Sequence, residues 1–309
     1  MTPTVDDAQP IGSVPGKAIA CLNCGAPLSG PFCSACGQRS VPPRPTTREL
    51  VGDAYGELVG WDGKLARTVR LLLVHPGSLT REVIEGRRIH YVTSVKLYLM
   101  CSVLYFLVQA GAPLPDLGAS FDVGFGVGVG ETPTPGEAAF AKAITSGRGS
   151  LSEAERGLLE HEIESQPWLL RGMFRAMAED YRGLMRRAGD AMPRVLFVLI
   201  PVLAAVLALF YRGRHYPEHL YFAVHFGAFV FIVLTIESLT AYTRSLVAIA
   251  AAQLIGALVI LVYGIVAQHR VYGGSWLVTG AKAVGVSVVY GALWSSVVLA
   301  VTLWASRSS

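Results

Sequence analysis

The sequence predicts an all-α membrane protein with a small N-terminal zinc ribbon, amphipathic helices and about five transmembrane helices. The chain is 52% hydrophobic and only 16% charged, whereas about a quarter of the residues in a soluble domain are charged. The missing charge is concentrated in long uncharged stretches, which predicts membrane spans. Paired cysteines close to the N-terminus predict the zinc ribbon.

The N-terminal part begins with residues 1–20, which are rich in Pro, Gly, Ser and Asp without periodicity and are expected to be disordered. Residues 21–38 contain two CxxC pairs. Two thiolates from one tight turn can reach the same ion, and four of them make a closed tetrahedral site. We therefore expect a structural zinc ion, with a redox dithiol or an iron site as the alternatives. The four ligands would be Cys21, Cys24, Cys33 and Cys36.

The next segment links the ribbon to the membrane. Residues 39–45 form a Pro-rich linker that should be extended. Residues 46–91 show apolar residues at helical spacing, which predicts amphipathic juxtamembrane helices. A capping box at Thr46 and Glu49 opens the first of them, and a short helix over about 78–86 is the last.

The first transmembrane helix is predicted at 92–111, because residues 97–115 contain no charge and about 20 residues span the hydrocarbon. Residues 112–193 should form an extracytoplasmic loop, in which 111–150 lacks regular structure. Residues 151–190 are expected to be helical, with a capping box at Ser152 and Glu155 and a break at Pro167. The helix after Pro167 is amphipathic and basic, so it could lie on a membrane surface or pack on the protein. Its apolar stripe consists of Leu170, Phe174, Met177, Tyr181 and Leu184.

Transmembrane helices 2–5 are predicted within 194–306. The apolar stretches are 195–211, 219–243, 245–268 and 283–306, and Glu237 is the one charged residue in them. The first of these stretches is short and contains Pro201, which a membrane helix tolerates when neighbouring groups satisfy the backbone.

Basic residues ahead of the first span and near its start predict the orientation. The positive-inside rule places the N-terminus in the cytoplasm, and five spans then place the C-terminus outside. The same residues could contact anionic lipid or phosphate, or serve as a topology signal alone. They are Arg81, Arg87, Arg88 and Lys96.

Polar residues inside the spans are the other candidate site. Glu237 is costly in hydrocarbon unless it is paired, neutral or facing a cavity, so it is either functional, structural or close to the outer interface. His219 and His225 lie in the same predicted helix but about 240° apart on its wheel. They are candidates for an intramembrane metal or proton site, or for structural hydrogen bonds.

Three blocks of sequence together resemble a bacterial domain-of-unknown-function family. They are CLNCGAPLSGPFCSACGQ (21–38), HPGSLTREVIEGRRIHYVTSVKLYL (75–99) and YPEHLYFAVHFGAFVFIVL (216–234). The resemblance implies a multi-pass protein of the bacterial inner membrane with a zinc-ribbon head, and it implies no established activity. Gly227 stands where the family leads us to expect a further polar or His position, which weakens a metal site in that helix.

No catalytic residues are predicted, because the sequence shows no nucleophile–base spacing, phosphate loop or HExxH motif. Nucleic acid is not an expected partner, since the basic residues line membrane edges. We expect a membrane-anchored interaction or regulatory protein, with membrane lipids and a cytoplasmic protein at the zinc ribbon as partners. A small transporter or channel that uses Glu237 and the histidines is the rival, and a lipid-modifying enzyme is a third hypothesis.

Overall fold

The computed structural model describes residues 20–38, 63–111, 134–243 and 245–307. Most of the predicted disordered N-terminus, the linker at 39–45, the capping box at Thr46 and the glycine-rich stretch at 121–130 lie outside these residues. The described part is all-α, with no β-strand. Its nine α-helices are α2 (Lys64–Val74), α3 (Ser78–Ile84), α4 (Ser94–Gly111), α6 (Pro135–Ser146), α7 (Glu153–Ser165), α8 (Trp168–Phe210), α9 (Tyr216–Thr240), α10 (Leu246–Tyr272) and α11 (Trp276–Arg307).

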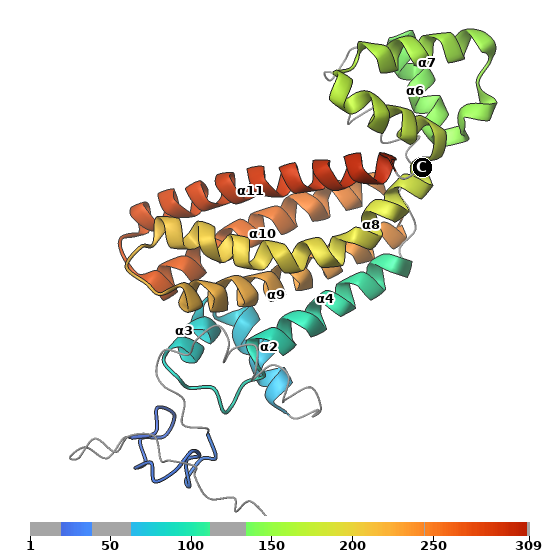
Figure 1. The fold of residues 1–309 in the computed structure, drawn as a ribbon. Helices are drawn as coiled ribbons and strands as arrows, with labels where there is room; N and C mark the ends of the chain where they lie inside the picture. Colours follow the sequence, from blue (N-terminus) through green and yellow to red (C-terminus); the bar gives the residue numbers. More distant parts are fainter. Residues whose placement is uncertain (1–19, 39–62, 112–133, 244, 308–309) are drawn as a thin grey trace, which may run out of the picture.

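Four bodies follow one another along the molecule (Figure 1). The knuckle is residues 20–38, and the cap is α2 and α3. The bundle is α4, the second half of α8, α9, α10 and α11. The lobe is residues 134–190, which include α6, α7 and the first half of α8. Figure 1 places the knuckle and cap near one end of the bundle and the lobe at the other.

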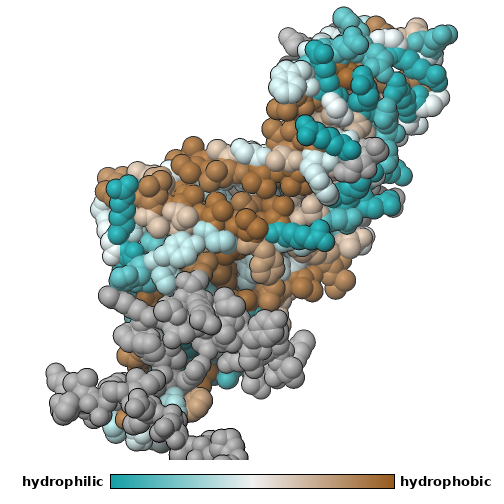
Figure 2. Space-filling view, viewed as in Figure 1, coloured by the Kyte–Doolittle hydropathy of each residue, from teal (hydrophilic) through white to brown (hydrophobic). Residues whose placement is uncertain are grey.

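Five helices are long and apolar enough to cross a membrane, as the sequence predicts: α4, α8, α9, α10 and α11. Large hydrophobic side chains on their outer faces are exposed, among them Leu107, Leu254 and Val288. Figure 2 shows this hydrophobic surface over the long helices and a hydrophilic surface over the lobe. In a bilayer such a surface faces lipid, and the helices satisfy their own backbone groups.

The spans alternate in direction along the chain, which fixes the two ends of the bundle. Helices α4 and α9 run parallel: Tyr98 near the start of α4 lies against Gly227 in the middle of α9, and further along both helices Gln109 accepts a hydrogen bond from Ser238 (3.0 Å). Short connections then make α8, α9, α10 and α11 antiparallel to their sequence neighbours. The knuckle end therefore collects the start of α9 and the end of α10, while the lobe end collects the end of α9 and the start of α10.

The cap is attached to the bundle by buried polar contacts. Tyr263 of α10 donates a hydrogen bond to the carbonyl of Leu72 (2.8 Å), one of the four carbonyls that the end of a helix leaves unpaired. Gly77, at φ +77°, brings the chain against the backbone of α10, where a Cβ atom would lie 2.8 Å from the carbonyl oxygen of Ala267. Only glycine combines this φ with this closeness.

The lobe corrects the prediction that 111–150 lacks regular structure. Residues 135–146 form α6, which begins with a capping box between Thr134 and Glu137 and has Pro135 in its first turn. The glycine-rich residues 121–130 precede this capping box, and the prediction of a loop extends from them over the start of the helix. The predicted capping box at Ser152 and Glu155 is present at the start of α7.

The amphipathic helix after Pro167 packs on the protein, which settles the choice that its sequence left open. Met177 and Leu184 of its stripe are buried in a cluster with Leu159, Ile163 and Ala305. The helix changes direction at Asp180, whose backbone is non-helical (φ −148°, ψ 74°) and whose carboxylate accepts a hydrogen bond from the Gly183 amide (2.8 Å). A side-chain oxygen that accepts from the amide three residues later is typical of an N-cap residue, so a new helical segment begins at Asp180. It continues through Pro193 to Phe210, and the expected boundary at 193/194 is not a break in the helix.

Candidate functional site

The two halves of the knuckle adopt the same turn. In each half the glycine amide after the CxxC pair donates to the carbonyl of the first cysteine, from Gly25 to Cys21 and from Gly37 to Cys33 (both 2.8 Å). Both glycines have φ near +75°, a conformation that costs other residues free energy. The repeated CxxCG sequence therefore builds two equal thiol-bearing turns.

The four thiols converge at the spacing of a tetrahedral metal site. The sulfur atoms of Cys21 and Cys36 are 3.7 Å apart, those of Cys24 and Cys33 are 3.6 Å apart, and all four lie within 4.8 Å of one another. A zinc–sulfur distance of about 2.3 Å at tetrahedral angles separates sulfur atoms by about 3.8 Å. The cysteines are not joined by disulfides, so the cluster can bind a metal ion.

The local electrostatics favour a cation among these sulfur atoms. Backbone amides of Cys24 and Asn23 point at Cys21 and lower its thiol pKa to about 7. The Ala26 amide acts in the same direction on Cys24, but desolvation and the neighbouring thiols outweigh it and raise the Cys24 pKa to about 12. Four thiolates repel one another when no cation is present, and a bound metal removes that penalty.

The knuckle is clamped to the loop that joins α3 to α4. The amide nitrogen of the Gln38 side chain donates to the carbonyl of Gly86 (2.7 Å), and its oxygen accepts from the amides of Arg88 (3.2 Å) and Ile89 (3.3 Å). Leu22 packs over Gly86, where a Cβ atom would lie 2.7 Å from its side chain. Sequence reasoning missed Gln38, and its position directly after the second CxxCG was the available signal.

The four basic residues predicted to contact anionic lipid or phosphate have different environments in the structure. Arg87 makes a two-pronged hydrogen-bonded pair with Glu82 (2.6 and 2.7 Å) and also pairs with Glu85. Arg88 donates to the Val83 carbonyl (3.1 Å) and lies over the ring of Tyr221.

Arg81 is exposed and donates to Glu85 (2.6 Å). This hydrogen bond, followed by the contact with Arg87, lowers the Glu85 pKa. Lys96 lies at the start of α4 and is half-buried.

His219 and His225 are both buried, but each belongs to a separate contact. The Nδ1 atom of His225 is hydrogen-bonded to the hydroxyl of Thr80 in α3 (2.9 Å). The Nδ1 atom of His219 is hydrogen-bonded to the hydroxyl of Tyr272 in α10 (2.9 Å). The Nε2 atom of each histidine is buried without a hydrogen-bond partner among the described residues.

Glu237 is not brought to the histidines. It lies in the last turn of α9, 12 residues after His225 or about 18 Å along the helix. Its carboxylate lies against Gly256 of α10, where a Cβ atom would be 1.5 Å from Oε1. Three residues could pair with a carboxylate in these spans, but His225 is hydrogen-bonded to Thr80, Arg194 is exposed and Arg244 lies outside the described residues. Glu237 therefore occupies the lobe end of the bundle, close to where the spans finish.

The fold and the knuckle define a helical membrane protein that carries a four-cysteine metal-binding cluster. Residues 62–106 match the family model described as Protein of unknown function (DUF3667). This stretch runs through the cap and most of α4 and does not include the cysteines, so it supports a family of uncharacterised domains for that segment. Searches of curated proteins and of solved structures each gave no match.

Proposed function

We propose that this protein is a membrane-anchored interaction or regulatory protein that holds a structural zinc knuckle at the cytoplasmic surface of a bacterial inner membrane. The observation that carries the proposal is the clamp made by Gln38, which ties the knuckle to the α3–α4 loop. The cap is in turn tied to the bundle through Thr80 and Tyr263. A freely tethered ribbon would need no such chain of contacts.

Zinc is the proposed ion because four thiolates in a tetrahedral arrangement are its commonest structural ligand set. Four protein ligands leave no open position for water, so the ion would stabilise the knuckle and would not catalyse a reaction. With few apolar residues in 20–38, the free energy of metal binding would supply most of the stability of this unit.

Two exposed apolar side chains on the knuckle support a protein partner. Phe32 is 60% exposed and Leu22 is 45% exposed. Aromatic residues are enriched at the centres of protein interfaces, and the metal-bound turns would hold Phe32 in one place. The basic residues of the cap and of the α3–α4 loop, which contacts the knuckle, support the cytoplasmic orientation through the positive-inside rule.

Site-specific photo-cross-linking in cells tests this role. A photo-reactive amino acid at Phe32 should cross-link one discrete protein, and Cys33→Ser should abolish the product because the knuckle unfolds. The matched control is the same amino acid at Trp168, an exposed aromatic residue of the lobe. A product of equal yield at Trp168, or one at Phe32 that survives Cys33→Ser, would contradict the proposal.

Reporter fusions after Pro45, within 131–150 and after Ser309 test the orientation separately. The expected locations are cytoplasmic, external and external. A cytoplasmic signal from the fusion within 131–150 would overturn it.

The rival function, a small transporter or channel, is favoured by one observation. The Nε2 atoms of His219 and His225 are buried without a hydrogen-bond partner among the described residues, and buried polar atoms are normally paired. Water or a transported ion could occupy these positions. The test is uptake or efflux in reconstituted vesicles. If His225→Gln abolishes transport while the variant stays folded, the transporter is favoured over the interaction protein.

A further inference from the structure

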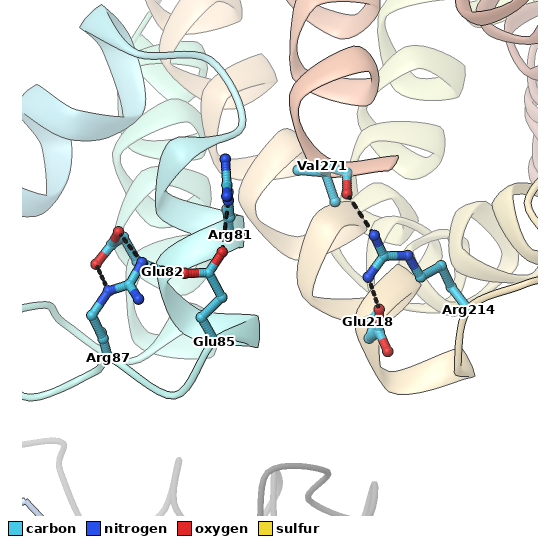
Figure 3. A network of polar contacts seen from close by, with 7 residues as sticks. All are labelled: Arg81, Glu82, Glu85, Arg87, Arg214, Glu218 and Val271. Atoms are coloured by element: carbon cyan, nitrogen blue, oxygen red, sulfur yellow. Dashed lines mark hydrogen bonds and ion pairs between the residues drawn. The ribbon is translucent and has the colours of Figure 1, made fainter. Parts of the chain in front are cut away.

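A pocket of about 300 Å³ opens at the knuckle end of the bundle. Three arginines line it, one from each of three segments that are far apart in the sequence: Arg81 of α3, Arg214 of the α8–α9 connection and Arg270 of α10. The wall also contains apolar surface from Val271 and Tyr272. Figure 3 shows Arg81 and Arg214 on opposite sides of this region, each beside its carboxylate partner.

Protein acceptors hold each guanidinium in place. Arg214 donates to Glu218 (3.2 Å) and to the Val271 carbonyl (3.3 Å). Arg270 donates through Nη1 to the carbonyl of Pro76 (2.7 Å) and to the hydroxyl of Ser78 (3.0 Å). A guanidinium carries five N–H donors, so each arginine keeps donors that these bonds do not use.

The pocket carries more positive charge than its own residues neutralise. Glu85 is the acidic residue in its wall, and that carboxylate is shared between Arg81 and Arg87. Glu218 neutralises Arg214. In the described part of the chain, the hydrogen bonds of the half-buried Arg270 go to neutral acceptors alone. A partly buried cation is stable when an anion completes its surroundings.

We propose that this pocket binds a phosphate group and that Arg81, Arg214 and Arg270 are its ligands. The planar fork of a guanidinium matches two phosphate oxygens, and such charge-assisted bonds are among the strongest hydrogen bonds in proteins. Basic pockets between membrane helices at the cytoplasmic side commonly take lipid head groups. The same chemistry would hold a dissolved phosphate compound, so the two sources are separated by experiment.

The lipid source is tested with purified full-length protein in nanodiscs. Discs of phosphatidylcholine containing a minor share of phosphatidylglycerol should yield protein with one retained phosphatidylglycerol in native mass spectrometry. The dissolved source is tested in pure phosphatidylcholine discs, with inorganic phosphate or ATP added and thermal stabilisation measured. Retention of the lipid identifies a head-group site, and stabilisation by the dissolved phosphate identifies a soluble ligand. The absence of both lipid retention and stabilisation by dissolved phosphate would overturn the proposal.

Arg81→Gln is the main variant, because Arg81 is hydrogen-bonded to Glu85, the residue directly after its own helix, and the loss of this local contact should not unfold the bundle. Arg270→Gln is the second variant, and its melting point in ligand-free discs reports any structural damage. The matched control is Arg212→Gln, which removes the same charge from an exposed residue at the same end, outside the pocket.

Each pocket variant should weaken binding about tenfold, the scale of one charge-assisted hydrogen bond, and the control should change it less than twofold. Equal losses in all three variants would mean a general surface attraction and would overturn the pocket. If Arg270→Gln is folded and both pocket variants bind as well as the wild type, the proposal would also be overturned.

Discussion

The contact between Thr80 and His225 should make a measurable contribution to the attachment of the cap. Thr80→Val keeps the shape of the side chain but removes the hydroxyl that pairs with Nδ1 of His225 at 2.9 Å. Both residues are 2% exposed, so water cannot replace the lost partner. A buried polar atom left unpaired costs about 1–3 kcal/mol, and the expected loss in the free energy of unfolding is of that size.

The control for this substitution is Thr235→Val in α9. Thr235 is also buried, but its hydroxyl donates to the Phe231 carbonyl of its own helix (2.7 Å). That carbonyl keeps its helical hydrogen bond, and such back-bonding adds little stability. The expected loss is below about 0.5 kcal/mol.

A double-mutant cycle with His225→Leu isolates the pair. The Thr80→Val and His225→Leu combination should be less destabilised than the sum of the single variants, by about 0.5–3 kcal/mol. Unfolding would be followed by helicity during titration of mixed micelles with a denaturing detergent. Hydrogen exchange of the α3 amides should also accelerate in Thr80→Val. A loss in Thr80→Val no larger than in Thr235→Val, with zero coupling, would refute the reasoning.

Four further substitutions have defined outcomes. Purified wild-type protein should contain one equivalent of zinc by elemental analysis, and Cys33→Ser should lose it. Full retention of the metal in Cys33→Ser would contradict the assignment of the four cysteines as zinc ligands. Gly77→Ala should lower the free energy of unfolding by about 2–4 kcal/mol, because a Cβ atom would meet the α10 backbone at a left-handed residue, and a loss below about 0.5 kcal/mol would contradict the close packing. The hydrogen bond from Lys142, followed by the hydrogen bonds with Ser152, lowers the Glu155 pKa to about 2, so the stabilising effect of these contacts is present above pH 4.5 and is lost as the pH falls towards 2. The melting points of wild type and Glu155→Gln should therefore converge across that range, and a constant difference would contradict stabilisation by the ionised Glu155. Glu237→Gln should be tolerated if the side chain is structural, and loss of the cellular phenotype with normal expression would favour the transporter.

The sequence predicts the parts of this protein whose chemistry is local. Long uncharged stretches identify the spans, since hydrocarbon accepts few charges whatever the neighbours are. The repeated CxxCG sequence predicts the convergence of four thiols, because each half contains its own turn and its own pair of sulfur atoms. Ser152 and Glu155 predict the start of α7 for the same reason, as both partners of the capping box lie within four residues.

Tertiary structure decided whatever depends on partners distant in the sequence. Arg81, Arg87 and Arg88 read as one basic block, yet the fold assigns one to a pocket, one to the acidic groups of α3 and one to a tyrosine ring. Helix periodicity separates His219 from His225, but it does not show that Thr80 and Tyr272 are their partners.

The joining of the three arginines into one pocket is the clearest case. Arg81, Arg214 and Arg270 are separated by 50 residues or more in the sequence, and no local pattern relates them. They meet because α9 and α10 run in opposite directions, so that the start of one and the end of the other reach the cap together. The sequence thus determined which segments enter the membrane and which four residues can bind a metal. The packing of the helices alone decided which charges became neighbours, because that choice depends on the direction and order of the spans.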